Sequence, residues 1–170
     1  GDAQNCVQCL NTVIGKMSQV LADAGEIADK KLAPIAPGID RAFLVEAFNR
    51  ILVTKCHLAG FTPGISVFIE KEDLLPFEEA KLYGHNAIHA SLAYLGAFRG
   101  CRKMAELSRH SDLMAIARAA FIDESGAALC RKYAALDDPL FTPAGYKEFA
   151  EDLLTRMTNP YLDDAVGRAA

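Results

Sequence analysis

The sequence predicts a mainly α-helical domain that carries a small antiparallel β insertion. From Pro76 onward, apolar residues recur at the three- and four-residue spacing of amphipathic helices, between clear helix start and stop signals. Before that point, short runs of β-branched residues are separated by Gly and Pro. The length of 170 residues and the 51% share of hydrophobic residues are enough to build a full hydrophobic core.

The N-terminal part is expected to contain a helix, a loop and short strands. Residues 6–24 place apolar side chains at helical spacing and predict an amphipathic helix that stops at Gly25. Residues 30–41 contain two prolines and a glycine and predict a loop. Residues 48–55 and 65–70 are apolar and β-branched and predict strands of a small sheet. One of these two runs could instead be the end of a helix, because short apolar runs do not separate the two structures.

The C-terminal part is expected to be helical almost throughout. A first helix begins at Pro76, which suits the first helical turn, and runs to about Arg99 before a glycine. Residues 111–133 and 142–157 predict two further helices, which open at Ser111-Asp112 and at Thr142-Pro143. A last helix is expected to begin at Asn159.

The charge balance excludes some classes of function. The 18 Lys and Arg residues against 22 Asp and Glu residues give a net charge of −4 and an isoelectric point of about 5.6, whereas a nucleic-acid surface needs clustered positive charge. No apolar run approaches the roughly 20 residues that cross a bilayer, and no signal peptide opens the chain. The five cysteines are odd in number and scattered, which is typical of reduced thiols in a cytoplasmic protein. We therefore expect no nucleic-acid or membrane partner and a cytoplasmic location.

The two ends of the chain indicate a piece of a longer protein. The chain opens at Gly1 without an initiator Met and stops at Ala170 inside a run that still has helical character. The alternative is a complete small domain whose ends have been trimmed. No Gly-x-Gly-x-x-Gly turn follows an apolar strand, so any dinucleotide-binding domain is expected outside these residues.

Polar side chains gather on one face of the helix expected at residues 79–96. At 100° per residue, four of them fall within one broad face: Lys81, His85, Asn86 and His89. The rest of this stretch is rich in Ala, Leu, Ile and Tyr, so we expect the helix to be substantially buried. Burial disfavours the charged form of an amine, and a lysine in such a place suits the role of general base.

Two other interpretations of this face stay open. Lys81 can extend its amine into solvent, and the histidines can be core residues whose hydrogen bonds are satisfied. His85 and His89 are also four residues apart, the spacing of two zinc ligands on a helix. Asn86 stands where zinc proteases carry Glu, and no Cys/His cluster supplies further ligands, so we expect no metal.

The same residues resemble the signature of the polyol-specific long-chain dehydrogenases, the family of mannitol dehydrogenases and mannitol-1-phosphate 5-dehydrogenases. The centre of the resemblance is Lys81-x4-Asn86-x2-His89, followed by Ala-Tyr-Leu-Gly. Three flanking segments match in the expected order: Asp2-Ala3-Gln4-Asn5, Ile39-Asp40-Arg41 and Asn159-Pro160-Tyr161-Leu162-x-Asp164-x3-Arg168. The resemblance spans nearly the whole chain.

The resemblance implies a fold, an order of domains and a reaction. Residues 1–170 would form the family's C-terminal helical domain, truncated and similar to that of the phosphogluconate dehydrogenases, and a nucleotide-binding Rossmann domain would precede it. The parent protein would use NAD or NADP, bound mainly by that N-terminal domain, to oxidise a secondary alcohol of an open-chain polyol or polyol phosphate to a ketose. The fragment alone would be inactive, because the site lies between the two domains.

The resemblance also implies a role for individual residues. Lys81 would be the general base that takes the hydroxyl proton. Asn5 and Asn86 would donate hydrogen bonds to the developing alkoxide, and His89 would hold a substrate hydroxyl beside the lysine. The remaining substrate contacts would be Asp40, Arg168 and His85, of which His85 lies outside the matched pattern.

A competing interpretation belongs to a different class of function. The chain could be a helical scaffold or interaction domain that keeps the fold of this family without its chemistry. The residues encoded before Gly1 discriminate between the two, because an enzyme of this kind needs a nucleotide-binding strand–turn–helix there.

Overall fold

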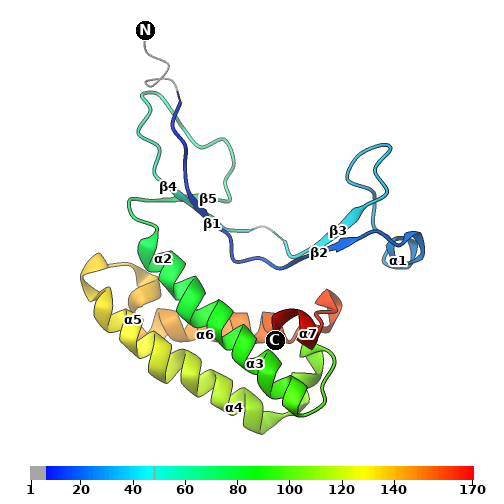
Figure 1. Ribbon diagram of the computed structural model, residues 1–170. Helices are drawn as coiled ribbons and strands as arrows, with labels where there is room; N and C mark the ends of the chain where they lie inside the picture. The colour runs from blue at the N-terminus through cyan, green and yellow to red at the C-terminus, as the bar shows by residue number, and fades with distance from the viewer. Residues whose placement is uncertain (1–6, 48) are drawn as a thin grey trace. The chain divides into compact units, whose positions relative to one another are not determined.

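The computed structural model describes residues 7–47 and 49–170 of the chain (Figure 1). These residues divide into a first unit, which ends at Glu70, and a second unit, which begins at Lys71. The candidate residue Asn5 lies outside the described residues. The strands lie within the first 71 residues and the long helices follow them, as the sequence predicts for the parts before and after Pro76.

Two small sheets form the first unit. One has the strand order β1-β4-β5 and joins β1 (Thr12–Val13), β4 (Ile51–Thr54) and β5 (Phe68–Lys71). The other pairs β2 (Ser18–Leu21) with β3 (Ala42–Val45). Both β1–β4 and β2–β3 are antiparallel.

The strand predictions at residues 48–55 and 65–70 are confirmed, because β4 lies within the first run and β5 overlaps the second. Each expected strand joins β1, which comes from the N-terminal segment, in one sheet. The small β insertion therefore includes an N-terminal strand, β1, in addition to the two runs that the sequence pattern indicates.

The expected helix over residues 6–24 is wrong, because its described residues form the strands β1 and β2 and no helical turn before Ala24. Val13 lies opposite Leu52 in one sheet, and Leu21 lies opposite Ala42 in the other. Val13 and Leu21 fit a helical stripe, but these partners far along the chain bury them instead. The segment is also rich in β-branched residues, which favour extended backbone. Helical spacing is a local signal and does not report such long-range pairs.

The connection between β2 and β3 contains a short helix and then a loop. The helix α1 (Ala24–Asp29) begins where the Asp23 carboxylate accepts a hydrogen bond from the Glu26 N–H at 2.9 Å, so Gly25 lies inside a helix and does not end one. The loop expected at residues 30–41 is confirmed. Gly38 has a φ of 81° there, in the left-handed region that glycine adopts without steric cost.

Long helical segments build the second unit (Figure 1). The first rod joins α2 (Leu75–Glu79), the π-helical turn η2 (Ala80–Asn86) and α3 (Ala87–Phe98). The second rod joins α4 (Ser111–Ala119), the π-helical turn η4 (Ala120–Gly126) and α5 (Ala127–Lys132). The helix α6 (Pro143–Met157) follows, and its capping residue Thr142 accepts a hydrogen bond from the Gly145 N–H at 3.0 Å. The helices expected at residues 76–99, 111–133 and 142–157 are confirmed.

Shorter turns connect these helices and close the chain. The 3₁₀ turns are η3 (Met104–Arg109), η5 (Ala134–Leu136), η6 (Pro139–Phe141) and η7 (Pro160–Leu162). The last helix expected from Asn159 is broken, because Asp163 adopts a left-handed φ of 50° between η7 and α7 (Val166–Ala169). This break orients the residues that follow it, which matter for the site.

Aromatic side chains fill the centre of the second unit. Phe121 of η4 and Tyr146 of α6 are its largest fully buried side chains, and their ring centroids lie 6.0 Å apart with an edge-to-face angle of 75°. Burial of one such ring contributes about 1.5–3 kcal/mol to stability. The Tyr146 hydroxyl lies 3.3 Å from the Ser125 Oγ, so this buried polar group keeps a hydrogen-bond partner.

Both π-helical turns carry a glycine that faces this aromatic centre. A Cβ at Gly84 would lie 2.5 Å from Phe121 Cε2 and 2.8 Å from the Tyr146 Oη, and a Cβ at Gly126 would lie 2.6 Å from Tyr146 Cδ1. Neither glycine has a positive φ, so each is required for close approach and not for backbone freedom. The missing side chains allow the two rods and α6 to pack closely around these rings.

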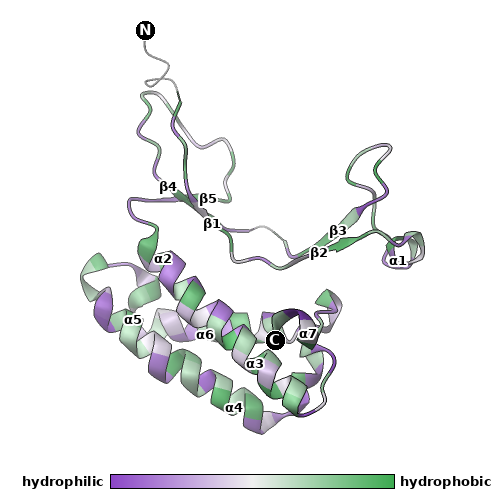
Figure 2. Ribbon diagram, viewed as in Figure 1, coloured by the Kyte–Doolittle hydropathy of each residue, from purple (hydrophilic) through white to green (hydrophobic). Residues whose placement is uncertain are grey.

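Hydrophobic residues lie along β2 and β3 of the first unit (Figure 2), and some of them are exposed. Val20 and Phe43 form a cross-strand pair whose side chains are 55% and 39% exposed. Across residues 7–47 and 49–170, no helix is both long enough and apolar enough to cross a lipid bilayer.

Candidate functional site

The polar residues singled out from the sequence lie on the first rod. Lys81 and His85 are in the π-helical turn η2, Asn86 is its last residue, and His89 lies in the first turn of α3. A π turn holds more residues than the 3.6 of an α-helix, since its hydrogen bonds run to the fifth residue. Residues four apart, such as Lys81 and His85, lie on the same side of such a turn.

The rod that carries these residues is only partly buried. His85 is buried at 7% exposure, the His89 side chain is 13% exposed, and Lys81 is half-buried. Asn86 is exposed. The expectation of a substantially buried helix is wrong for part of its surface, because three apolar or aromatic side chains are more than half exposed: Leu82, Tyr83 and Tyr94.

The two histidines stack along the rod. The ring planes of His85 and His89 are 17° apart, and their centroids lie at 6.0 Å. This arrangement keeps both rings on the same side of the helix, as the four-residue spacing predicts.

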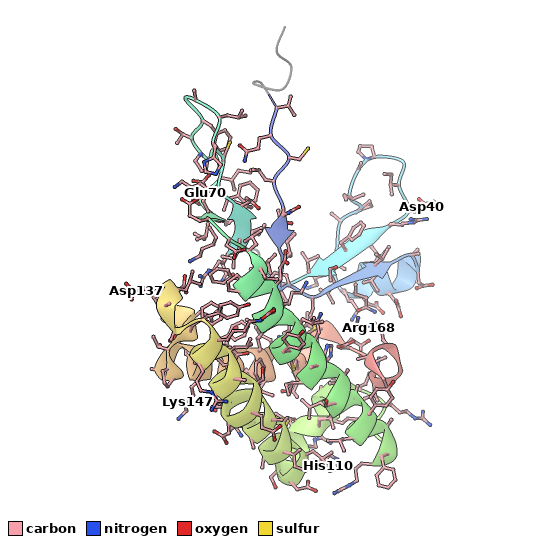
Figure 3. All side chains as sticks on the ribbon, turned by 60° about the vertical axis from the view of Figure 1, so that its left-hand side comes forward. Asp40, Glu70, His110, Asp137, Lys147 and Arg168 are labelled. Carbon is pink, nitrogen blue, oxygen red and sulfur yellow. The ribbon has the colours of Figure 1, made fainter. Side chains whose placement is uncertain are left out.

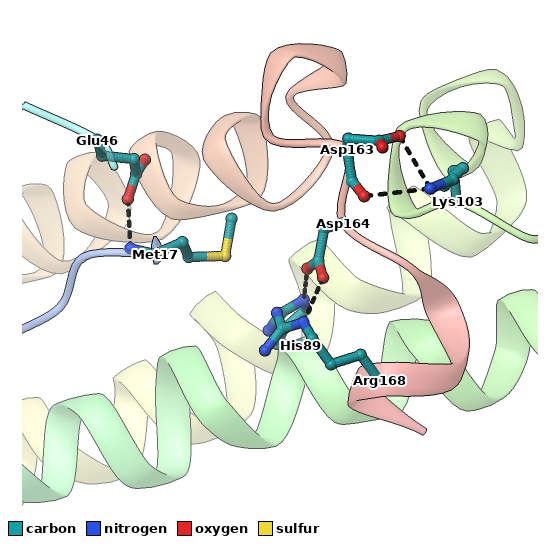
Figure 4. Close-up of polar contacts among 7 residues, drawn as sticks. All are labelled: Met17, Glu46, His89, Lys103, Asp163, Asp164 and Arg168. Atoms are coloured by element: carbon teal, nitrogen blue, oxygen red, sulfur yellow. Dashed lines mark hydrogen bonds and ion pairs between the residues drawn. The ribbon is translucent and has the colours of Figure 1, made fainter. Parts of the chain in front are cut away.

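His89 meets the C-terminal segment through a shared carboxylate (Figure 4). The His89 Nε2 lies 3.0 Å from the Asp164 Oδ2, and the Arg168 Nε donates to the Asp164 Oδ1 at 2.7 Å. The Asp164 side chain is only 5% exposed, whereas the Arg168 side chain is 60% exposed. Figure 3 shows Arg168 on α7 beside the first rod. The structure thus joins His89 and Arg168, which were both singled out by the resemblance.

Backbone hydrogen bonds hold Asp164 in place. The Met104 N–H donates to the Asp164 carbonyl at 2.9 Å, and the Val166 N–H donates to the Arg102 carbonyl at 2.9 Å. Between these two bonds, Lys103 forms an antiparallel bridge with Ala165. These contacts attach the segment between η7 and α7 to the segment that follows α3.

The neighbouring carboxylate has a different partner. Asp163, at the left-handed break, accepts from the Lys103 ammonium at 2.9 Å, and its carbonyl accepts from the same ammonium at 3.3 Å (Figure 4). The two consecutive acidic residues therefore have different partners: Asp163 pairs with Lys103, and Asp164 pairs with His89 and Arg168.

Burial lowers the pKa of His89 below its usual value. The Asp164 carboxylate opposes this effect through its charge and its hydrogen bond, and the positive charge of Arg168 adds to the lowering. Because Arg168 shares the carboxylate, Asp164 orients the imidazole without keeping it protonated. His89 is therefore neutral at neutral pH.

The remaining candidates are placed as follows. Asp40 is exposed in the loop before β3 of the first unit (Figure 3). Asn5 lies outside the described residues. Asp164 belongs to the C-terminal motif quoted above, but no role for it was predicted from the sequence. Its spacing of four residues from Arg168 was the available signal, because such a pair meets on a helix.

In the part of the chain that the structure describes, the two histidines spaced four residues apart do not belong to a metal centre. No group of three or more His, Cys, Asp or Glu side chains gathers there in a way that could hold a metal ion.

The described residues also do not fit the pyrophosphate of a dinucleotide. Such a group binds the free N–H groups at a helix start that follows a strand. At the start of α1 the Asp23 carboxylate accepts from the Glu26 N–H, and at the start of α2 the Asp73 carboxylate accepts from the Leu75 N–H at 2.9 Å. The negative charge of these two carboxylates would repel a phosphate, so the helix starts after β2 and β5 do not suit a pyrophosphate.

Comparisons with known proteins agree on one family. Residues 73–170 match the family described as Mannitol dehydrogenase C-terminal domain. The chain is 33% identical over 141 residues to a mannitol-1-phosphate 5-dehydrogenase from Brevibacillus brevis, an alignment that covers 82% of this chain and 35% of the relative. The chain thus spans about a third of the length of that relative.

Solved structures share the fold. A mannitol 2-dehydrogenase from Pseudomonas fluorescens, in a ternary complex with NAD and D-mannitol, superimposes with a TM-score of 0.63 at 20% identity, covering 94% of this chain and 30% of that one. A D-sorbitol dehydrogenase in substrate-free form gives a TM-score of 0.66 at 19% identity, covering 95% of this chain and 31% of that one. The predicted fold class is confirmed. With more than half of its residues matched, the chain belongs to the mannitol dehydrogenase family, and residues 73–170 match that family's C-terminal domain.

Proposed function

We propose that the chain is the substrate-binding and catalytic part of an NAD(P)-dependent polyol or polyol-phosphate dehydrogenase. The observation that carries the proposal is the convergence of two distant segments on one cluster. His89 lies on the rod that carries Lys81, and it shares the Asp164 carboxylate with Arg168, which lies 79 positions further along the chain. These segments are the ones that resemble the family's substrate site.

The substrate class is taken from the relatives. Their names refer to mannitol 1-phosphate, mannitol and sorbitol, which are open-chain sugar alcohols or a phosphate of one. A substrate of this kind presents a row of hydroxyl groups. The polar side of the first rod offers a row of four hydrogen-bonding side chains, with an amine, an amide and two imidazoles along about two turns.

In the proposed reaction Lys81 is the general base. Its amine, when unprotonated, takes the proton of the hydroxyl whose carbon is oxidised. That carbon also gives up its hydrogen as a hydride, for which NAD⁺ or NADP⁺ would be the acceptor, and the carbonyl of a ketose forms. The exposed amide of Asn86, together with Asn5, donates hydrogen bonds to the oxygen as negative charge develops on it. The neutral imidazole of His89 holds a hydroxyl of the substrate next to the lysine, and Asp40, Arg168 and His85 contribute further substrate contacts.

The oxidant would be NAD or NADP. Because the helix starts after β2 and β5 do not fit a pyrophosphate, we place the cofactor on a preceding nucleotide-binding domain. The residues of this chain then supply the proton acceptor and the substrate contacts.

The proposal is tested on the full-length protein with a panel of sugar alcohols and their phosphates, each supplied with NAD⁺ or NADP⁺. We expect the reduced cofactor to accumulate with at least one substrate of the panel, as followed by its absorbance. A folded full-length protein that reduces neither cofactor with any member of the panel would instead be a helical scaffold that has kept only the fold.

A further inference from the structure

We propose that Asp164 is a positioning residue that fixes His89 in the tautomer with its proton on Nε2, so that Nδ1 is left to accept a hydrogen bond from a substrate hydroxyl. The assignment of Nδ1 to a substrate hydroxyl rests on the proposed function. The assignment of the tautomer does not, because it follows from contacts within the chain.

The donors and acceptors around Asp164 leave one arrangement. A guanidinium can only donate, so the Arg168 Nε–H donates to the Asp164 Oδ1 at 2.7 Å. A carboxylate can only accept, so its second oxygen, Oδ2, accepts from the His89 Nε2 at 3.0 Å. A neutral imidazole carries one N–H, and this contact places it on Nε2. The Nδ1 atom then carries a lone pair.

The position of Asp164 does not depend on a substrate. Its carbonyl is bonded to the Met104 N–H, and Lys103 and Ala165 form a backbone bridge beside it. Its side chain is 5% exposed, so water competes little for the carboxylate oxygens. The carboxylate is therefore in place before any ligand binds.

The surroundings of His89 favour its neutral form. The charged or titratable groups that contact it are Asp164 and Arg168 from the α7 segment and His85 from its own rod. Burial lowers the pKa of His89, the charge of Arg168 lowers it further, and Asp164 only opposes these effects. A neutral ring has a defined tautomer, which makes the proposal measurable.

The substitution Asp164→Asn reverses the expected tautomer. Arg168 can only donate, so the amide oxygen of the new side chain must face the guanidinium and the amide NH₂ must face His89. Two donors would then oppose each other unless the His89 proton moves from Nε2 to Nδ1. The variant thus retains the shape of the site and inverts the hydrogen-bonding character of the ring atom offered to the substrate.

The decisive experiment is NMR of this chain with ¹⁵N-labelled histidine, using long-range ¹H–¹⁵N correlations that separate protonated from unprotonated ring nitrogens. His89→Gln assigns the signals. We expect Nε2 to be protonated and Nδ1 unprotonated in the unsubstituted chain at pH 7.5, and the reverse in Asp164→Asn. Asp163→Asn is the matched control, because Asp163 pairs with Lys103 and Asn tolerates its left-handed backbone. It should leave the tautomer of His89 unchanged.

A proton on Nδ1 in the unsubstituted chain would overturn the proposal, and so would an unchanged tautomer in a folded Asp164→Asn variant. If that variant does not fold, as judged by circular dichroism, the spectrum of the unsubstituted chain alone decides. In the full-length enzyme, Asp164→Asn should raise KM for the polyol about tenfold or more, the effect of one mispaired hydrogen bond, while Asp163→Asn should not. A full-length protein without activity would contradict the proposed function and leave the tautomer result standing.

Discussion

His89 is held between two opposing effects, and their balance has a consequence for stability. Burial lowers its pKa in the folded chain, while the unfolded chain keeps the usual value of about 6.5. Below about pH 6.5 the unfolded state therefore binds more protons at this position than the folded state. The contribution of neutral His89 to stability is complete above that pH and is lost as the pH falls toward the lowered folded pKa.

The substitution His89→Gln tests this sign. Glutamine does not titrate, and its amide can still donate a hydrogen bond to Asp164. Urea unfolding at pH 7.5 and pH 5 should show a larger loss of free energy of unfolding for the unsubstituted chain than for the variant. All other groups titrate in both chains, so the difference reports His89. Equal losses would mean that the folded chain does not lower the pKa of His89.

The sequence could predict only those parts of the candidate site that depend on the spacing of residues along one helix. The separation of Lys81, Asn86 and His89 along one helix is visible in the sequence and in the structure. The role of Asp164 is not visible, because it depends on a contact with His89 across 75 residues. A carboxylate four residues before an arginine is common on helices, and nothing local indicates that an imidazole shares it.

At the scale of elements, the same division between local and distant causes explains which predictions were correct. The helices after Pro76 are marked by Pro, Ser and Thr at their starts and by apolar periodicity, which are local signals. The error over residues 6–24 arose where pairing with β3 and β4 decides the conformation. The π-helical turns were missed because one additional residue in a turn hardly changes the apolar pattern. Gly84 and Gly126, which lie in these two turns, were a local sign that the backbone approaches its neighbours closely there.

The packing around the π-helical turn η2 gives a prediction for Gly84→Ala. The new Cβ would meet the Phe121 ring at 2.5 Å and the Tyr146 hydroxyl at 2.8 Å, and both side chains are fully buried. Because neither ring can move away freely, we expect a loss of about 1–3 kcal/mol in the free energy of unfolding.

Gly167→Ala is the matched control for this substitution. Gly167 is also helical, and a Cβ there meets nothing within 4 Å. Alanine is favoured over glycine in helices by roughly 0.5–1 kcal/mol, so this variant should be neutral or slightly more stable. Equal denaturation midpoints for the two variants would show that the rods do not pack closely at Gly84.

At the scale of the whole molecule, the two units differ in how much core they contain. Among the described residues, the buried hydrophobic side chains that precede Lys71 are four: Val13, Leu21, Ala42 and Val53. The first unit relies on short strands, and such small sheets have little stability of their own. The second unit contains the aromatic centre and the remaining buried hydrophobic residues.

Limited proteolysis should therefore act on the two units in order. Short digestion with a protease of broad specificity should cut first within residues 7–70, because local opening is easiest where few apolar contacts hold the backbone. A fragment close to residues 71–170 should persist and retain its helical circular dichroism. Early cleavage within the second unit, identified by mass spectrometry, would contradict this division of stability.

The central claim is that the first rod carries the base of a polyol dehydrogenase, and Lys81→Met in the full-length protein tests it most directly. Methionine keeps the apolar length of the half-buried side chain, so the variant should fold with unchanged or slightly higher stability. Lys147→Met, at an exposed lysine of α6, is the control and should oxidise polyol at the unsubstituted rate. The measurement is the turnover number for oxidation of the preferred polyol. The account predicts that Lys81→Met lowers it by about 10²- to 10⁴-fold, the contribution of a positioned acid–base group. Polyol oxidation near the unsubstituted rate by a folded Lys81→Met protein would contradict it.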